Sequence, residues 1–233
     1  MSGMRTAVVT GGGTGIGRAI AAELVARGLD VVITGRREDV LKQAAAEIGA
    51  RAVAFDAADP AAVDAALEHL PERVDVLVNN AGGLVDGDDL KQQWLAMYEA
   101  NVVTAVLVTT ALQERLADQG RVVTIGSIAG RRGGGSYGAA KAAVEAWTAE
   151  LAFKLGGRGI TANVVAPGYV SETEFFGGGM SEERYRTLVA QTANGRAGTP
   201  ADVAATVAFL SSPEAGHVTG QVVAVNGGAH LGR

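Results

Sequence analysis

The stretch Thr10-Gly11-Gly12-Gly13-Thr14-Gly15-Ile16-Gly17 separates two segments of different composition. Residues 5–10 are apolar and β-branched, as in a buried strand, and residues 18–24 are alanine-rich, as in a helix. Glycines between a strand and a helix let the backbone turn tightly and approach an anion closely. The N-terminus of the helix would add unpaired N–H groups and a partial positive charge. This order therefore predicts a phosphate-binding turn that opens an α/β fold.

Two other glycine-loop patterns do not fit this stretch. A P-loop that runs from Gly12 to Gly17 requires a lysine next, but Arg18 follows. The G-x-G-x-x-G pattern fails in both registers, because its last position falls on Ile16 or on Arg18. The position of the turn after a first strand still favours a dinucleotide site. The residues expected to line it are Gly11, Thr14, Gly15, Ile16 and Gly17.

Apolar segments and alanine-rich segments alternate along the rest of the chain. The apolar segments lack polar alternation, which is typical of strands covered by helices on both faces. This alternation predicts an α/β fold with a Rossmann-like, doubly wound, seven-stranded parallel sheet and helices on both faces. We expect one domain over residues 1–233, because no linker or repeat divides the chain. The predicted strands are residues 5–10, 30–34, 51–55, 74–78, 120–125, 160–166 and 221–225.

Several helices have recognisable starts. Asp59-Pro60 and Thr199-Pro200 each combine an N-cap residue with proline in the first turn, and Asp202 completes a capping box with Thr199. Ser136 is also expected to be an N-cap. Alanine-rich helices are predicted around residues 105–116 and 139–155.

Residues 168–196 interrupt the alternation, and we expect them to form a substrate loop. They contain Phe175, Phe176, three glycines at 177–179 and a short helical segment that begins at Ser181. A glycine hinge beside two aromatic side chains is typical of a lid over a site. An ordinary surface excursion is the alternative.

The composition limits the kinds of partner. The net charge is −5, so no basic surface for nucleic acid or anionic membrane is expected. No uninterrupted apolar run approaches the ~18 residues of a membrane span. Cysteine is absent, and His69, His217 and His230 follow no metal-ligand spacing. We therefore expect a cytoplasmic protein that binds no metal, nucleic acid or membrane.

The end of the second predicted strand indicates which dinucleotide would bind. An acidic residue about 20 positions beyond the glycines would bind a free ribose 2′-hydroxyl. Gly35 stands there instead, followed by Arg36 and Arg37. Arginine binds a 2′-phosphate through paired, charge-assisted hydrogen bonds, so NADP(H) is favoured over NAD(H). The alternative is that both arginines only open a solvated helix with Glu38 and Asp39.

Three polar residues indicate proton chemistry. Ser127 follows the fifth predicted strand, at the edge where ligands bind in open α/β sheets. Tyr137 and Lys141 are four residues apart, which places a phenol and an ammonium on one face of a helix. A nearby cation would lower the phenol pKa from its usual ~10, so that Tyr137 could act as a general acid or base. The same spacing also fits a tyrosine that packs beside a surface lysine.

In this order, the motifs resemble those of the short-chain dehydrogenase/reductase family over nearly the whole chain. Each motif alone is a weak signal, whereas the ordered series is specific. Besides residues 10–17 and the Ser127, Tyr137 and Lys141 set, the resemblance rests on Asn79-Asn80-Ala81-Gly82, Asn101, Asn163-Val164-Val165-Ala166-Pro167-Gly168, Val218-Thr219-Gly220-Gln221 and Asn226-Gly227-Gly228.

The resemblance implies a role for each site residue. Tyr137 would exchange a proton with the substrate oxygen while hydride moves to or from the nicotinamide, and Ser127 would hydrogen-bond that oxygen. Lys141 would bind the nicotinamide ribose and lower the pKa of Tyr137, and Asn101 would position a water. The remaining cofactor contacts would be Asp56 at the adenine, Asn80, Ala81 and Gly82 along the adenosine, and Pro167 and Gly168 beside the nicotinamide.

The chain departs from the family pattern in two places. The interval between Ser127 and Tyr137 looks shorter than usual, which would tighten the loop and reshape the pocket. Asn226 stands where the family often has aspartate, and we expect this change to be harmless. The resemblance also implies a homotetramer, or a homodimer, built through the two alanine-rich helices.

The sequence thus predicts an NADP(H)-dependent oxidoreductase that interconverts a small-molecule ketone and a secondary alcohol. A narrower alternative is a 3-oxoacyl-thioester reductase, for which Arg131 and Arg132 would receive an acidic carrier bearing phosphopantetheine. Another is a catalytically silent NADP(H)-binding regulatory or scaffold protein. The presence of both Tyr137 and Lys141 weighs against the silent alternative.

Overall fold

The computed structural model describes residues 4–173 and 180–231, in which strands and helices alternate as predicted. The strands are β1 (Thr6–Thr10), β2 (Asp30–Gly35), β3 (Arg51–Ala54), β4 (Val74–Asn79), β5 (Leu116–Ile125), β6 (Thr161–Pro167) and β7 (Val222–Val225). The α-helices are α1 (Gly15–Ala26), α2 (Glu38–Ile48), α3 (Pro60–Ala66), α4 (Leu90–Tyr98), α5 (Thr104–Leu112), α6 (Ala129–Arg132), α7 (Gly135–Gly156), α8 (Glu182–Ala190) and α9 (Pro200–Leu210). A π-helical turn, η1 (Glu99–Val103), joins α4 to α5, and short 3-10 turns lie at η2 (Gln113–Arg115) and η4 (Pro213–Ala215).

All seven strands form one parallel sheet in the order β3-β2-β1-β4-β5-β6-β7. The predicted fold class is therefore confirmed. The chain leaves β1 toward β2 on one side and returns to place β4 on the other. Ligands of open α/β sheets bind at such a switch point, beyond the carboxyl ends of the strands. One domain for residues 1–233 stays a prediction.

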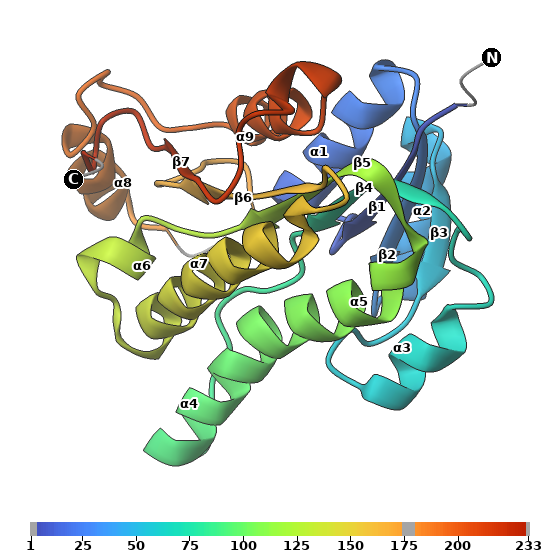
Figure 1. The fold of residues 1–233 in the computed structure, drawn as a ribbon. Coiled ribbons are helices and arrows are strands. Elements are labelled where there is room, and N and C mark those ends of the chain that lie inside the picture. The colour runs from blue at the N-terminus through green and yellow to red at the C-terminus, as the bar shows by residue number, and fades with distance from the viewer. Residues whose placement is uncertain (1–3, 174–179, 232–233) are drawn as a thin grey trace.

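Helices cover both faces of the sheet (Figure 1). Val9 and Ile33 point to the face covered by α1, α2 and α9. Val8 and Val32 point to the opposite face, which α3, α5 and α7 cover. Because neighbouring residues of a strand face opposite sides, an unbroken apolar strand builds both cores at once.

The start of β5 differs from the prediction of residues 120–125. The strand begins at Leu116, which pairs with Val74, and the register of the ladder then shifts. The expectation of a helix to residue 116 is accordingly wrong at its end, because α5 stops at Leu112. Leu116 is buried in the core beneath the sheet, and this tertiary packing overrides the local helical composition.

The helix caps agree with the sequence at two positions and differ at one. Asp59 accepts a hydrogen bond from the Ala61 N–H, and Thr199 forms the predicted capping box. The helical segment expected from Ser181 is also present, and Ser181 caps it by accepting a hydrogen bond from the Arg184 N–H. The prediction that Ser136 is an N-cap is wrong. Helix α7 begins at Gly135, with Gly134 as its N-cap residue, and Ser136 lies within the first turn.

Among the described residues, the helical run Leu90–Arg115 is the one segment long and apolar enough to cross a membrane by length and composition, with a mean hydropathy of 1.5. A core helix can pass the same test. Val108 and Leu112 of this run pack into the core beneath the sheet. Asn101 and Thr104 are also buried, and their polar side chains donate hydrogen bonds to backbone carbonyls within the protein. These contacts are those of a core helix.

Candidate active site

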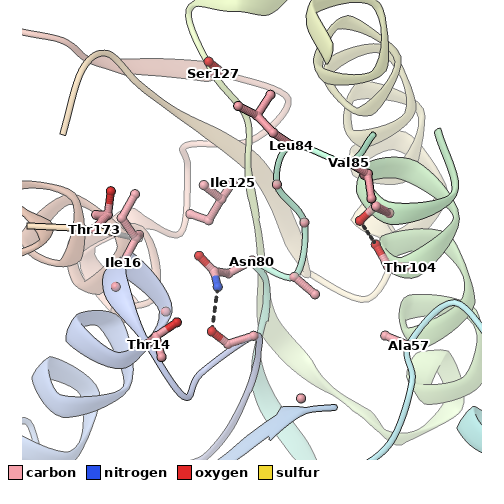
Figure 2. A pocket seen from close by; sticks show the side chains of 18 of the residues that line it. Thr14, Ile16, Ala57, Asn80, Leu84, Val85, Thr104, Ile125, Ser127 and Thr173 are labelled. Carbon is pink, nitrogen blue, oxygen red and sulfur yellow. Dashed lines mark hydrogen bonds between the residues drawn. The ribbon is translucent and has the colours of Figure 1, made fainter. Parts of the chain in front are cut away.

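A cavity of about 1130 Å³ opens at the carboxyl ends of the central strands. Figure 2 looks into it, with Thr14 and Ile16 on one side and Leu84 and Val85 on the other. All the predicted site residues except Asn101 line this cavity. They are Gly11, Thr14, Gly15, Ile16, Gly17, Arg36, Arg37, Asp56, Asn80, Ala81, Gly82, Ser127, Tyr137, Lys141, Pro167 and Gly168.

The glycine turn presents bare backbone to the cavity. Gly15 has a φ of +51°, and the nearest described side chain to a Cβ there would be that of Thr173, at 3.7 Å. A Cβ on Gly17 would lie 2.2 Å from the Gly11 carbonyl oxygen, so α1 could not pack on the turn. Thr14 precedes α1 without capping it by a side-chain hydrogen bond. The first N–H groups of α1 thus suit an anionic group such as a pyrophosphate.

Thr10 organises this turn, although the sequence analysis gave it no role of its own. Its buried hydroxyl oxygen accepts hydrogen bonds from the backbone N–H groups of Asn80 (3.0 Å) and Ala81 (2.9 Å). The Asn80 side chain in turn donates to the carbonyls of Thr10 (2.9 Å) and Gly11 (3.1 Å). These bonds join the turn after β1 to the loop after β4. The sequence offered one signal for this role, because Thr10 is the first residue of the glycine stretch.

Arg36, Arg37 and Asp56 lie where β2 and β3 end. Both arginines line the cavity directly before α2, and Gly35 precedes them at the end of β2. One carboxylate oxygen of Asp56 accepts a hydrogen bond from the Ala58 N–H (3.0 Å). Phe55 and Ala57 line the same region, so this end of the cavity combines apolar walls with positive charge.

Ser127, Tyr137 and Lys141 meet at the opposite end of the cavity. The Tyr137 and Ser127 side chains are hydrogen-bonded, and the Ser127 oxygen accepts a bond from the Ala129 N–H (3.2 Å). Lys141 is buried and donates a hydrogen bond from Nζ to the Ile125 carbonyl (2.9 Å). The same Nζ lies 5.7 Å from the centre of the Tyr137 ring. A phenol, a hydroxyl and an ammonium therefore share one wall.

The expectation that Lys141 makes Tyr137 more acidic is wrong for this structure. Burial raises the pKa of Tyr137 to about 12, and the hydrogen bond with Ser127 opposes that rise. Burial also lowers the pKa of Lys141, from 10.5 to about 8. Removal of both groups from water disfavours their charged forms, and this effect outweighs their proximity. Tyr137 is thus protonated at neutral pH.

Asn101 lies behind the cavity, in the π-helical turn η1. Its side-chain oxygen accepts a hydrogen bond from the Gly83 N–H (3.0 Å), and its amide nitrogen donates to the Gly83 carbonyl (2.8 Å) and the Met97 carbonyl (3.0 Å). Asn101 is buried, while its neighbour Ala100 and its partner Gly83 line the cavity. In this geometry Asn101 holds the loop after β4. The water-positioning role stays a prediction.

Gly168 and the tail of the chain approach each other closely. A Cβ on Gly168 would lie 2.8 Å from the Cβ of Asn226. Asn226 accepts a hydrogen bond from the Gly228 N–H and donates one to the His230 carbonyl, each at 2.9 Å. The amide therefore serves both as donor and as acceptor, which an aspartate could not do.

Part of the excursion between β6 and α9 borders the cavity. Tyr169, Val170, Thr173 and Leu188 line it, and the Tyr169 and Tyr185 rings pack edge to face at 5.9 Å. The residues on which the lid hypothesis depends, Phe175, Phe176 and the glycines 177–179, lie outside the described residues. The lid stays a prediction.

Leu84 and Val85 were missed by the sequence analysis. They follow the Asn80-Ala81-Gly82 motif and form an apolar wall of the cavity (Figure 2). Their side chains carry no polar signal, and the path of their loop depends on the Asn101 contact with Gly83. Tertiary structure therefore places them, and no local pattern could have found them.

The described residues fit a dinucleotide and offer no metal cluster. Within that part of the chain, no three histidine, cysteine, aspartate or glutamate side chains come together as metal ligands. The bare glycine turn, the arginines at the end of β2 and the proton-bearing groups at the far wall line one continuous cavity. Together these features suit a nicotinamide dinucleotide.

Comparison with known proteins gives relatives along nearly the whole chain. The family model described as enoyl-(acyl carrier protein) reductase matches residues 11–230. The chain is 36% identical to the 3-oxoacyl-(acyl-carrier-protein) reductase FabG of Salmonella typhimurium over 242 residues, covering 97% of this chain and 98% of that protein. It is also 36% identical to the short-chain reductase protein NovJ of Streptomyces niveus, covering 95% and 92% of the two chains.

Solved structures share this fold along nearly the whole chain. A blue fluorescent protein from a metagenomic library, in complex with NADPH, superposes with a TM-score of 0.87 at 35% identity, covering 97% of this chain and 98% of that one. A short-chain type dehydrogenase/reductase from Mycobacterium ulcerans has a TM-score of 0.90 at 30% identity, covering 98% and 91% of the two chains.

Proposed function

The chain belongs to the short-chain dehydrogenase/reductase family and is thus an oxidoreductase that acts on CH–OH and C=O groups with NAD(P). On this basis we propose that it reduces a ketone to a secondary alcohol, with Tyr137 as general acid. The observation that carries the proposal is the meeting of Ser127, Tyr137 and Lys141 on one wall of the cavity.

In reduction, the Tyr137 hydroxyl donates its proton to the substrate carbonyl oxygen. The phenol carries its proton at neutral pH. Burial raises its pKa to about 12, which opposes proton release, so the transfer depends on stabilisation of the phenolate that forms. Ser127 donates a hydrogen bond to the same oxygen and holds the carbonyl against Tyr137. Bound NADPH supplies the hydride. Lys141 keeps its positive charge below about pH 8 and stabilises the phenolate that remains on Tyr137 after proton transfer.

NADP(H) is the proposed preferred cofactor. Arg36 and Arg37 line the cavity where β2 ends, and guanidinium groups bind a phosphate with paired hydrogen bonds. Two solved relatives support this preference, because one is in complex with NADPH and another, a short-chain dehydrogenase from Burkholderia cenocepacia, is in complex with NADP.

The test is turnover of a panel of ketones and 3-oxoacyl thioesters, each with NADPH and with NADH, by wild type and by Tyr137→Phe. Wild type should consume NADPH faster than NADH. Tyr137→Phe should lose about 10²- to 10⁴-fold in kcat, the usual contribution of general acid catalysis. NADPH binding, followed by fluorescence, should persist in the variant. Wild type that binds NADPH yet reduces no member of the panel would contradict the proposal and favour the silent scaffold.

A 3-oxoacyl thioester is the narrower proposed substrate. FabG relatives of 36% identity match along 97% of the chain, and Leu84, Val85 and Leu188 give the cavity apolar walls. The arginines suggested for a carrier are engaged within the chain. Arg131 forms an ion pair with Glu145 (2.9 Å), and Arg132 donates to the Gln191 side chain (3.2 Å). The proposal thus rests on the relatives and the apolar walls, and no longer on this arginine pair.

A homotetramer, or a homodimer, is the proposed assembly. Leu95, Val103 and Phe153 expose 54%, 38% and 90% of their surface on the α4–η1 run and on α7. Large apolar side chains gathered on neighbouring helices are typical of an interface between subunits. A cytoplasmic location stays a prediction.

A further inference from the structure

The helix α6, directly after Ser127, is tied to α7 by an ion pair. Arg131 Nε lies 2.9 Å from Glu145 Oε2. The Glu145 side chain is only 13% exposed, whereas that of Arg131 is 38% exposed. Glu145 Oε1 is buried and has no hydrogen-bond partner among the described residues. Arg131 is therefore the group that compensates a largely buried carboxylate, and its loss would leave that charge unpaired.

Two glycines bring α6 and α7 into close contact at the same place. A Cβ on Gly130 would lie 3.0 Å from the Ala142 nitrogen and 3.3 Å from Glu145 Oε1. A Cβ on Gly138 would lie 2.8 Å from the Ala129 carbonyl oxygen. The contact runs along the turns of α7 that carry Tyr137 and Lys141. A sideways shift of α6 would thus change its distance from the helix that bears the reacting phenol.

Ser127 is bonded to α6 through its backbone and its side chain. The Ala129 N–H donates to the Ser127 hydroxyl oxygen (3.2 Å), and the Gly130 N–H donates to the Ser127 carbonyl (3.0 Å). Movement of residues 129–131 therefore moves the hydroxyl that hydrogen-bonds Tyr137.

We propose that Arg131 and Glu145 are positioning residues, whose ion pair holds the Ser127 loop against α7 and so fixes the distance between the Ser127 and Tyr137 hydroxyls. This inference rests on the proposed carbonyl reduction and adds to it a pair of residues that touch neither substrate nor cofactor. The pair acts through Ser127 on the geometry of proton transfer, so it affects turnover more than cofactor binding.

The test compares Glu145→Gln, Arg131→Gln, the double variant and Arg131→Lys with wild type. The two single variants should each lower kcat about tenfold, less than the hundredfold that a misplacement of about 1 Å can cause. The KM for NADPH should stay within about twofold of wild type, because the cofactor contacts lie elsewhere. The double variant should lose no more than either single one, because both remove one interaction. Arg131→Lys, which keeps the charge, should recover most of kcat.

Glu23→Gln is the matched control, because Glu23 and Arg27 form an Nε–Oε1 pair of 2.8 Å on α1. It should leave kcat unchanged. An unchanged kcat in Glu145→Gln, an equal loss in Glu23→Gln, or additive losses in the double variant would each overturn the inference.

If wild type reduced no carbonyl, the proposed function would fail, and hydrogen exchange of residues 128–132 would still decide this inference. Faster exchange in Glu145→Gln than in Glu23→Gln supports the tie between α6 and α7, and equal exchange overturns it.

Discussion

At the residue scale, burial decides the charge state of the two groups that are proposed to carry the chemistry. Tyr137 and Lys141 are neighbours on α7, yet each is surrounded mainly by protein rather than by water. Burial keeps the Tyr137 phenol protonated, and it lowers the pKa of the Lys141 ammonium to about 8, close to neutral pH. The proton that reduction would consume is therefore present on Tyr137 at neutral pH, while the raised pKa opposes its release.

The Lys141 pKa predicts how stability depends on pH. The folded value of about 8 lies below the ordinary 10.5, so between these values the unfolded chain binds more protons. The free energy of unfolding should therefore rise with pH through this window, by about 3 kcal/mol in total at ~1.4 kcal/mol per pKa unit. Lys141→Met should lack this rise. Urea unfolding at several pH values across the window measures it.

Lys154→Met, at an exposed position near the end of α7, is the control and should retain the rise. Parallel curves for wild type and Lys141→Met would show that Lys141 titrates at its ordinary pKa when folded.

The sequence predicts which reactive groups meet but not how they ionise. The spacing of Tyr137 and Lys141 is visible in the sequence, whereas the desolvation that reverses the expected pKa change depends on segments far along the chain. Asn101 shows the same limit. Its partner Gly83 lies 18 residues away, and no local pattern indicates that contact.

At the element scale, the junction between β1 and α1 depends on glycine for packing as well as for the proposed cofactor contact. The start of α1 sits directly on the turn, with Gly17 against the Gly11 carbonyl. Its neighbour Gly12 packs on the Ile33 side chain, where a Cβ would lie 2.6 Å from two of its carbons. The turn is therefore tightly packed where it faces the protein interior, and it exposes backbone atoms where it faces the cavity.

Gly17→Ala should displace α1 from the turn. The added Cβ would lie 2.2 Å from the Gly11 oxygen, and overpacking of this kind costs about 1–3 kcal/mol. NADPH affinity should fall together with the free energy of unfolding, because the first N–H groups of α1 move. Calorimetric titration with NADPH and urea unfolding measure the two effects.

Gly156→Ala is the comparison, since among the described residues no atom outside the adjacent backbone of α7 lies within 4 Å of the added Cβ. It should leave NADPH affinity unchanged. If Gly17→Ala bound NADPH as tightly as Gly156→Ala, the start of α1 would not be part of the cofactor site.

Element boundaries were predictable where a local signal marks them. An N-cap residue followed by proline predicts the starts of α3 and α9, and these helices begin at Pro60 and Pro200. The first residues of β5 carry no such signal. Leu116 enters the sheet because Val74 pairs with it, and this pairing exists only once the sheet has formed.

At the scale of the whole molecule, the proposed assembly depends on apolar side chains outside the core. Phe153 is 90% exposed on α7, and Phe153→Asp should weaken association of the subunits. Sedimentation velocity should show wild type as a tetramer, or a dimer, and the variant as a smaller species. Met4→Asp, at another exposed apolar residue, should leave the assembly intact.

Monomeric wild type at micromolar concentration would contradict the assembly. So would an unchanged sedimentation coefficient for Phe153→Asp, which would place any interface elsewhere.

The order of the strands has a consequence for biosynthesis. β1 is translated first but lies in the middle of the sheet, between β2 and β4. Until Val74–Asn79 has left the ribosome, one edge of β1 exposes unpaired N–H and C=O groups and apolar side chains. A nascent chain arrested before that point would be a substrate for chaperones, and the nucleotide crevice could form only after β4 had docked.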